Sequence, residues 1–165
     1  MTQPLNVVAE PRDISSGVRQ PSTVASGLAD VLADTYMLTY KTHAYHWNVE
    51  GPLFYSIHNL TEGQYEDMFA AADELAERIR AVGQMAPMTM SEIRERSVID
   101  DSKKAPTAGE MCQSLADDHE RIAQRLHALV KIAGEKNDPV TEDLATERSA
   151  FHEQAAWMLK ALVAE

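Results

Sequence analysis

The chain has one cysteine, Cys112, among its 165 residues. A single thiol cannot form an internal disulfide, which fits a reducing compartment. No apolar run approaches the roughly 18 residues that a membrane span needs. The N-terminus also lacks the basic segment and apolar stretch of a secretion signal. We therefore expect a cytoplasmic protein that does not span a membrane.

Positive charge is also scarce: 15 Lys and Arg residues stand against 26 Asp and Glu residues, and the formal net charge is −11. Such a surface repels the phosphates of nucleic acid and attracts cations. Acidity also keeps proteins soluble, so the charge by itself leaves both explanations open. The length and the 44% hydrophobic content predict one folded domain with a real core.

Apolar residues recur at three- and four-residue spacing in four long stretches, and no stretch has the pattern of a strand. This predicts four long amphipathic helices. The buried stripe of the first helix is predicted to comprise Val24, Leu28, Val31, Leu32, Tyr36, Tyr40 and Trp47.

Local signals set the ends of the first two helices. The first is predicted to begin at Ser22 or Thr23, since either hydroxyl can cap free N–H groups, and to end at Gly51-Pro52. The second is predicted to run from about residue 53 to residue 82, with Gly83 closing it.

Similar signals set the later helices. Capping boxes that begin at Thr89 and at Thr107 predict a short helix and the third long helix, which ends near Gly134. Asp138 followed by Pro139 predicts the start of the fourth.

The link between the second and third long helices is the longest, about 23 residues. A bundle needs such a link when these two helices run parallel. The sequence therefore predicts an all-α, ferritin-like four-helix bundle with a short extra helix in this link. Residues 1–21 are predicted to be a flexible tail, and residues 22–165 the bundle domain.

Histidine and carboxylate side chains gather on the second helix. His58, Glu62, Asp73 and Glu77 share one face, but Glu62 and Asp73 are separated by about 16 Å along the axis. One helix cannot bring both to a single metal ion.

The spacing is symmetric about Asp67 and Met68. If two copies of the helix cross antiparallel at this point, His58 of one copy faces Glu77 of the other, and Glu62 faces Asp73. A two-fold dimer would thus build two identical sites. His46, near the end of the first helix, is placed to supply another imidazole.

Mixed imidazole and carboxylate ligands suit iron, manganese or zinc, and open coordination positions allow chemistry with oxygen or peroxide. The alternative is a solvated helix face, on which carboxylates at four-residue spacing are common; Glu66 shares the same face. The Glu-x-x-His sequence of di-iron centres inside one bundle does not occur in the chain. This absence favours a site between subunits.

The chain resembles the Dps family (DNA-binding protein from starved cells), the small ferritins, from residue 23 to residue 162. The matching residues are His46-Trp47-Asn48, His58 twelve residues later, Asp73-x-x-x-Glu77-Arg78, and the stretch from His152 to Leu159.

The resemblance implies a dodecameric hollow shell, built from two-fold dimers, that oxidises Fe(II) and stores the ferric product. Hydrogen peroxide is the expected oxidant, and oxygen is the alternative oxidant. Zinc or manganese could compete with iron for the same site. Carried over by position, His46, His58 and Glu62 come from one subunit, and Asp73 and Glu77 from its partner. The family more often has Asp at the position of Glu62.

For three further residues the resemblance implies a functional role, but each also has a purely structural interpretation. Trp47 would quench oxidising radicals, or it is a core aromatic residue at the helix end. Asp117 and Asp143 would line an iron-entry pore, or they are exposed surface aspartates. His43 is expected to support the site or an interface rather than to bind metal.

The family name implies DNA binding, and the sequence departs from it. The charges of the N-terminal tail cancel, and the tail contains no lysine. We expect direct DNA binding to be weak or absent. A DNA-coating protein of the nucleoid with little ferroxidase activity is the alternative function.

Overall fold

The computed structural model describes residues 4–101 and 105–164. The long helices are α1 (Pro21–Asn48), α2 (Phe54–Ala81), α4 (Ala108–Glu135) and α5 (Pro139–Leu162), and the short elements are η1 (Pro4–Asn6) and α3 (Met90–Arg96). The described residues contain no strand. The prediction of a four-helix bundle with a short helix in the long link is confirmed.

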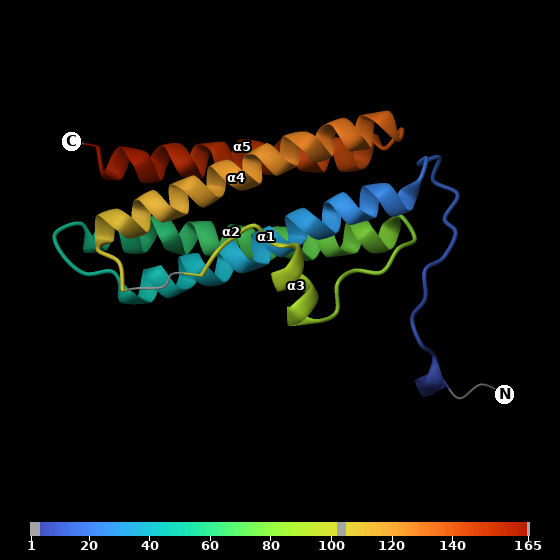
Figure 1. Ribbon diagram of the computed structural model, residues 1–165, viewed down its shortest axis with the longest axis horizontal. Coiled ribbons are helices and arrows are strands. Elements are labelled where there is room, and N and C mark those ends of the chain that lie inside the picture. The colour runs from blue at the N-terminus through green and yellow to red at the C-terminus, as the bar shows by residue number, and fades with distance from the viewer. Residues whose placement is uncertain (1–3, 102–104, 165) are drawn as a thin grey trace.

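The bundle consists of two helical hairpins that lie against each other (Figure 1). Helix α1 packs against α2, and α4 packs against α5, each pair joined by a short connection. The link from α2 to α4 runs back along the bundle and contains α3, so α2 and α4 point in the same direction (Figure 1). The inference of parallel second and third long helices from the length of this link was therefore correct.

Capping residues act where the sequence predicted them. The Thr89 hydroxyl accepts from Glu92 N–H, and the Thr107 hydroxyl accepts from Glu110 N–H, and both capping boxes are complete. The Asp138 carboxylate accepts from the Thr141 N–H at the start of α5. These short-range contacts satisfy N–H groups that have no partner within the helix.

The predicted cap of the first helix is wrong. Helix α1 begins at Pro21, and Gln20, in the left-handed conformation with φ 52°, is the cap residue without a side-chain hydrogen bond. Proline has no N–H to satisfy, and its fixed φ already suits the first turn of a helix. The hydroxyls of Ser22 and Thr23 are therefore not needed at this end.

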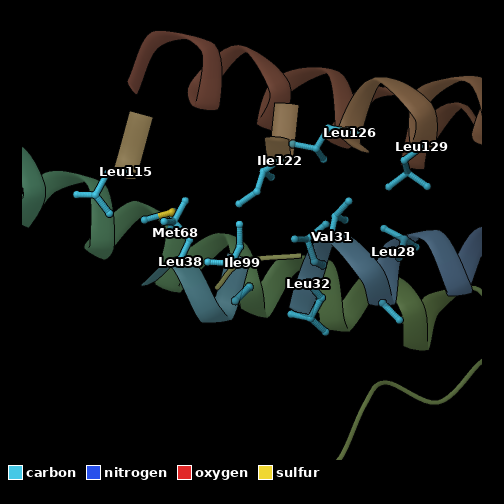
Figure 2. Packing of buried hydrophobic residues seen from close by; sticks show 14 of the residues in the cluster. Leu28, Val31, Leu32, Leu38, Met68, Ile99, Leu115, Ile122, Leu126 and Leu129 are labelled. Carbon is cyan, nitrogen blue, oxygen red and sulfur yellow. The ribbon is translucent and has the colours of Figure 1, made fainter. Parts of the chain in front are cut away.

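The core lies between the two hairpins (Figure 2). Burying each large aliphatic side chain stabilises the fold by about 1.5–3 kcal/mol. The largest fully buried side chains include Leu28, Leu38, Ile57, Met68, Leu75, Ile79, Leu115, Ile122, Leu126 and Leu129.

The predicted stripe of α1 is wrong in its second half. Tyr36, Tyr40 and Trp47 are 42%, 62% and 57% exposed, and the buried stripe continues through Leu38 and Tyr45 instead. Steps of four residues rotate the side chain by about 40° each, so a path of such steps leaves the buried face. Alternating steps of three and four residues keep it there.

A buried carboxylate fixes the long link to the bundle. Asp34 of α1 is fully buried and accepts from the Ser97 hydroxyl at 2.9 Å, the Val98 N–H at 2.7 Å and the Arg125 guanidinium at 2.7 Å. Burial raises the pKa of the Asp34 carboxyl, although the Val98 N–H and Arg125 act in the opposite direction. The contact joins α1, the link and α4.

The segment before α1 contacts the bundle at two points. Arg12 N–H donates to Gly83 O at 2.8 Å, and Arg19 N–H donates to Lys136 O at 2.7 Å. Gly83 has φ +86°, and a side chain there would clash with the Arg12 carbonyl. The division of the chain into a flexible tail and a bundle domain at residue 22 stays a prediction.

Candidate metal-binding half-sites

His46 and His58 lie side by side where α1 ends and α2 begins. Their ring centroids are 3.7 Å apart, and the rings are nearly parallel. His46 is 6% exposed, and His58 is half-buried. The tight α1–α2 connection at Gly51, with φ +109°, brings the two helices together here.

Each imidazole forms a hydrogen bond with the backbone carbonyl of the other histidine. His46 Nδ1 lies 2.9 Å from His58 O, and His58 Nδ1 lies 3.0 Å from His46 O. A carbonyl oxygen can only accept, so each Nδ1 must carry the hydrogen. In the neutral imidazole each Nε2 then has a free lone pair, which is the state that binds a metal ion.

Other rings surround this pair. His43 stacks on Tyr65 at 4.0 Å and contacts Trp47 at 4.1 Å, so it lies between them. Tyr65 in turn meets His46 edge-on at 5.2 Å. His43 therefore contacts aromatic rings, and its supporting role stays a prediction.

Glu62 lies one turn after His58 on α2 and is half-buried. The pKa of the nearby Tyr65 hydroxyl is raised by loss of solvation, and by the charges of Glu62 and Glu66. The half-site thus combines two imidazoles with local negative charge.

Asp73 and Glu77 lie farther along the same helix and are exposed. Asp73 is 15 residues after His58, which corresponds to about 22 Å along the axis. Asp73 opens onto a groove between α1, α2 and α3 that is mostly apolar, and Glu77 onto a second groove, between α2 and α5, that also contains Asp143.

One chain therefore carries the predicted ligands in two separate groups. Within the described residues, no set of three or more His, Cys, Asp or Glu side chains could hold a metal ion. The first group is His46, His58 and Glu62, and the second is Asp73 and Glu77. Together the two groups provide the imidazole and carboxylate donors that suit iron.

Several known proteins have sequences similar to that of this chain. A model of the ferritin-like domain family matches residues 25–165. DNA protection during starvation protein 2 of Bacillus anthracis is 35% identical over 80% of this chain and 90% of that protein. The corresponding protein of Helicobacter pylori is 31% identical over 83% of this chain and 96% of that protein.

The chain belongs to the Dps family of ferritin-like proteins.

Solved structures agree with this assignment. The Dps of Staphylococcus aureus matches this Dps-family chain with a TM-score of 0.85 and 32% identity, over 90% of this chain and 99% of that one. A Dps protein of Bacillus brevis matches with a TM-score of 0.84 and 30% identity, over 87% and 97%. The predicted ferritin-like fold is confirmed. No helix in the described residues is long and apolar enough to cross a membrane.

The two predicted pore residues of this Dps-family chain lie far apart. Asp117 is near the start of α4, where it accepts from Gln113 at 2.7 Å, and Asp143 is near the start of α5. Because α4 and α5 are antiparallel, these starts are at opposite ends of the hairpin (Figure 1). One chain does not bring the two carboxylates together, and the pore stays a prediction.

Tyr65 was not predicted as a neighbour of the histidines. It lies seven residues after His58, which places it on the same face of α2. That spacing was the available signal. The ring contact with His43 was not visible, because it depends on how α1 packs on α2.

Proposed function

We propose that this Dps-family chain is a ferroxidase and iron-storage protein. Two antiparallel copies would share each Fe(II) site, and a dodecameric shell would enclose the ferric product and protect DNA from oxidative damage. The observation that supports this most is the pair of reciprocal imidazole–carbonyl hydrogen bonds. They leave the Nε2 lone pairs of His46 and of His58 available as metal donors.

The exposed surface beside Asp73 supports the two-copy arrangement. Tyr36, Phe69, Met88 and Met90 are 42% to 80% exposed and lie along the same groove as Asp73. Contiguous exposed apolar surface of this kind marks an interaction site. A second copy on this face would cover it.

Asp67 and Met68, about which the ligand spacing on α2 is symmetric, would not themselves face a second copy. Met68 is fully buried in the bundle, and Asp67 pairs with Arg148 of α5 at 2.6 Å. The antiparallel contact would therefore be formed by their neighbours on the exposed face, such as Phe69. The axial position of the crossing is unchanged.

In the proposed reaction, two Fe(II) ions are the substrates and give up one electron each. One hydrogen peroxide molecule takes both electrons and two protons and becomes two water molecules. His46 and His58 would bind through Nε2, and the carboxylates of Glu62, Asp73 and Glu77 would stabilise the higher charge of Fe(III). Oxygen is the alternative oxidant, and zinc or manganese would compete for the same donors.

Trp47 would quench stray radicals from the iron chemistry. It is 57% exposed and contacts His43, so it is not the core aromatic residue of the alternative interpretation.

Peroxide-driven oxidation of Fe(II), followed by absorbance, tests the ferroxidase proposal. We expect the double variant His46→Ala/His58→Ala to lose on the order of 100-fold in rate, because outer partners of metal ligands alone cost 10- to 100-fold. His127→Ala is the matched control, since His127 is 54% exposed and pairs with Glu153 on α5. Equal rates in the double variant and the wild type would contradict the assignment.

Direct coating of DNA is the second candidate, because relatives have names that refer to DNA protection. The net charge of −11 opposes it. A gel-shift assay at low salt without divalent cations separates the two. We expect no shift, so that any protection of DNA in the cytoplasm would be chemical.

A further inference from the structure

Polar atoms without a partner gather inside the bundle, away from the half-sites. Among the described residues, the buried side-chain nitrogen and oxygen atoms without a hydrogen bond belong to Thr42, Gln64, His119 and His152. One of these residues comes from each long helix, and none is more than 4% exposed. Buried polar groups normally have partners, so this concentration needs an explanation.

Three of the four residues lie at one level. Asp67 of α2 pairs with Arg148 of the antiparallel helix α5 at 2.6 Å. Gln64 lies three residues before Asp67, and His152 lies four residues after Arg148, so both are displaced along the bundle in the same direction by about one turn. His119 of α4 contacts His152 directly. We call Gln64, His119 and His152 the polar layer.

Thr42 lies close to this level. Lys41 of α1 pairs with Asp118 of α4 at 2.6 Å. Thr42 follows Lys41, and His119 follows Asp118, so the two residues are within about one helical turn of each other along the bundle.

The two histidines share one hydrogen. His119 Nδ1 and His152 Nδ1 are 2.8 Å apart. Burial, helped by the charge of Arg148, lowers the pKa of His119 to about 3. Burial, with His119 and Arg148, also lowers the pKa of His152. Both rings are therefore neutral, and one Nδ1 donates to the other. One Nε2 then keeps a lone pair, and the other Nε2 carries a hydrogen.

We propose that the polar layer is a buried binding site for water, held between the Gln64 amide and the free Nε2 atoms of His119 and His152. The layer offers donors and acceptors together: an N–H and a lone pair from the imidazoles, and both kinds from the amide. Water both donates and accepts, and buried water commonly makes two to four such bonds. Water alone can thus satisfy every unpartnered atom of the polar layer.

The chemistry of the layer favours a neutral ligand over a cation. Its three residues supply no carboxylate, and the Arg148 guanidinium lies 4.4 Å from the centre of the Phe151 ring. That ring packs on His119 at 6.0 Å and on His152 at 5.2 Å. The Asp67 carboxylate already pairs with Arg148, so the layer offers a metal ion between the imidazoles no carboxylate of its own.

A surface groove lies next to the layer. Gln64, Gly63 and Phe151 line a groove between α2 and α5. A Cβ added at Gly63 would meet nothing within 4 Å, so no side chain fills the groove there. The Gln64 amide itself is enclosed, so only the wall formed by Gln64 separates the layer from this groove.

Crystal structures of the full chain, at a resolution that locates water, test the proposal. In the wild type we expect ordered density within about 2.7–3.2 Å of the Gln64 amide and of an imidazole Nε2. Gln64→Leu should lose this density, because the variant keeps the volume and removes the amide. Met68→Leu, one turn away in the same buried stripe, should keep it.

Two results would overturn the proposal. One is a dry layer in the wild type, with the Gln64 amide bonded directly to an imidazole. The other is an anomalous signal between His119 and His152 in wild-type crystals soaked in Zn(II), which would make the layer a cation site. The wild-type maps decide the question even if Gln64→Leu does not fold.

Discussion

Two histidine pairs of this molecule differ in what faces Nδ1. In the pair on α1 and α2, His46 and His58 each direct Nδ1 to a backbone carbonyl, at 2.9 and 3.0 Å. In the pair on α4 and α5, His119 and His152 direct Nδ1 at each other, at 2.8 Å. The first arrangement leaves two lone pairs at Nε2, and the second leaves one lone pair and one N–H.

The partner of Nδ1 thus determines which donors and acceptors each histidine pair offers at Nε2. Two lone pairs beside carboxylates suit a metal ion, whereas a mixed donor and acceptor beside an arginine suits water. Burial differs as well: His119 and His152 are both almost fully enclosed, whereas in the other pair only His46 is buried and His58 is half-buried. The three predictions that follow test this contrast.

We call His119 and His152 the inner pair, and His46 and His58 the outer pair. Replacing one histidine of the inner pair should destabilise the fold more than replacing both. His119→Leu leaves a buried His152 Nδ1 without its partner, and we expect a loss of about 1–3 kcal/mol in the free energy of unfolding. His119→Leu/His152→Leu replaces both partners by apolar groups and should recover most of that loss. Denaturant unfolding of the three proteins measures this, and a double variant less stable than the single one would contradict the shared hydrogen bond.

Acid should weaken the fold through the inner pair. The unfolded chain protonates His119 near pH 6.5, but the folded chain does so only near pH 3. The unfolded state therefore binds more protons in this window, and stability falls as the pH decreases from 6.5 towards 3, by about 1.4 kcal/mol per pH unit for each such histidine. His152 acts in the same direction.

Unfolding by denaturant at several pH values checks this dependence. The double variant His119→Leu/His152→Leu should show a shallower slope of stability against pH. The surface variant His127→Leu should keep the wild-type slope. Identical slopes in all three proteins would show that the inner pair does not resist protonation.

At the outer pair, Thr61→Val should have almost no effect. The Thr61 hydroxyl lies 3.5 Å from His46 Nδ1, but its closest contact is with Ile57 O at 2.7 Å, to which it donates. The backbone carbonyl of His58, not this hydroxyl, fixes the His46 hydrogen. The rate of Fe(II) oxidation by peroxide should stay within about twofold of the wild type. A tenfold loss would mean that Thr61 sets the tautomer.

Features that depend on a few neighbouring residues could be predicted from the sequence. The capping boxes at Thr89 and Thr107 and the Asp138 cap have local causes, and the structure confirms all three. The fold could be predicted as well, because the long link between α2 and α4 restricts how four helices can be connected.

Features that depend on packing between helices could not be predicted. The stripe of α1 was followed onto the exposed Tyr36 and Tyr40, because periodicity alone does not show which of two adjacent rows of side chains faces inward. The polar layer was also missed. His119 occupies an apolar stripe, but its contact with His152 depends on the register between α4 and α5.

The candidate site could be predicted from the sequence only in part. The grouping of His58 with Glu62, and of Asp73 with Glu77, could be predicted from spacing along one helix. The hydrogen bonds that orient His46 and His58 could not, because they join two helices. Whether the two groups meet depends on a second copy of the chain, so the site residues stay a prediction.

Complementation between two inactive variants tests the central claim, that each site needs two chains. One variant is His46→Ala/His58→Ala, and the other is Asp73→Asn/Glu77→Gln. Each alone should have little ferroxidase activity. Co-expressed in equal amounts, half of the dimers are mixed and each has one intact site, so about a quarter of the wild-type activity should return. If mass spectrometry confirms mixed assemblies but no activity returns, the two groups of ligands do not form one site across the dimer.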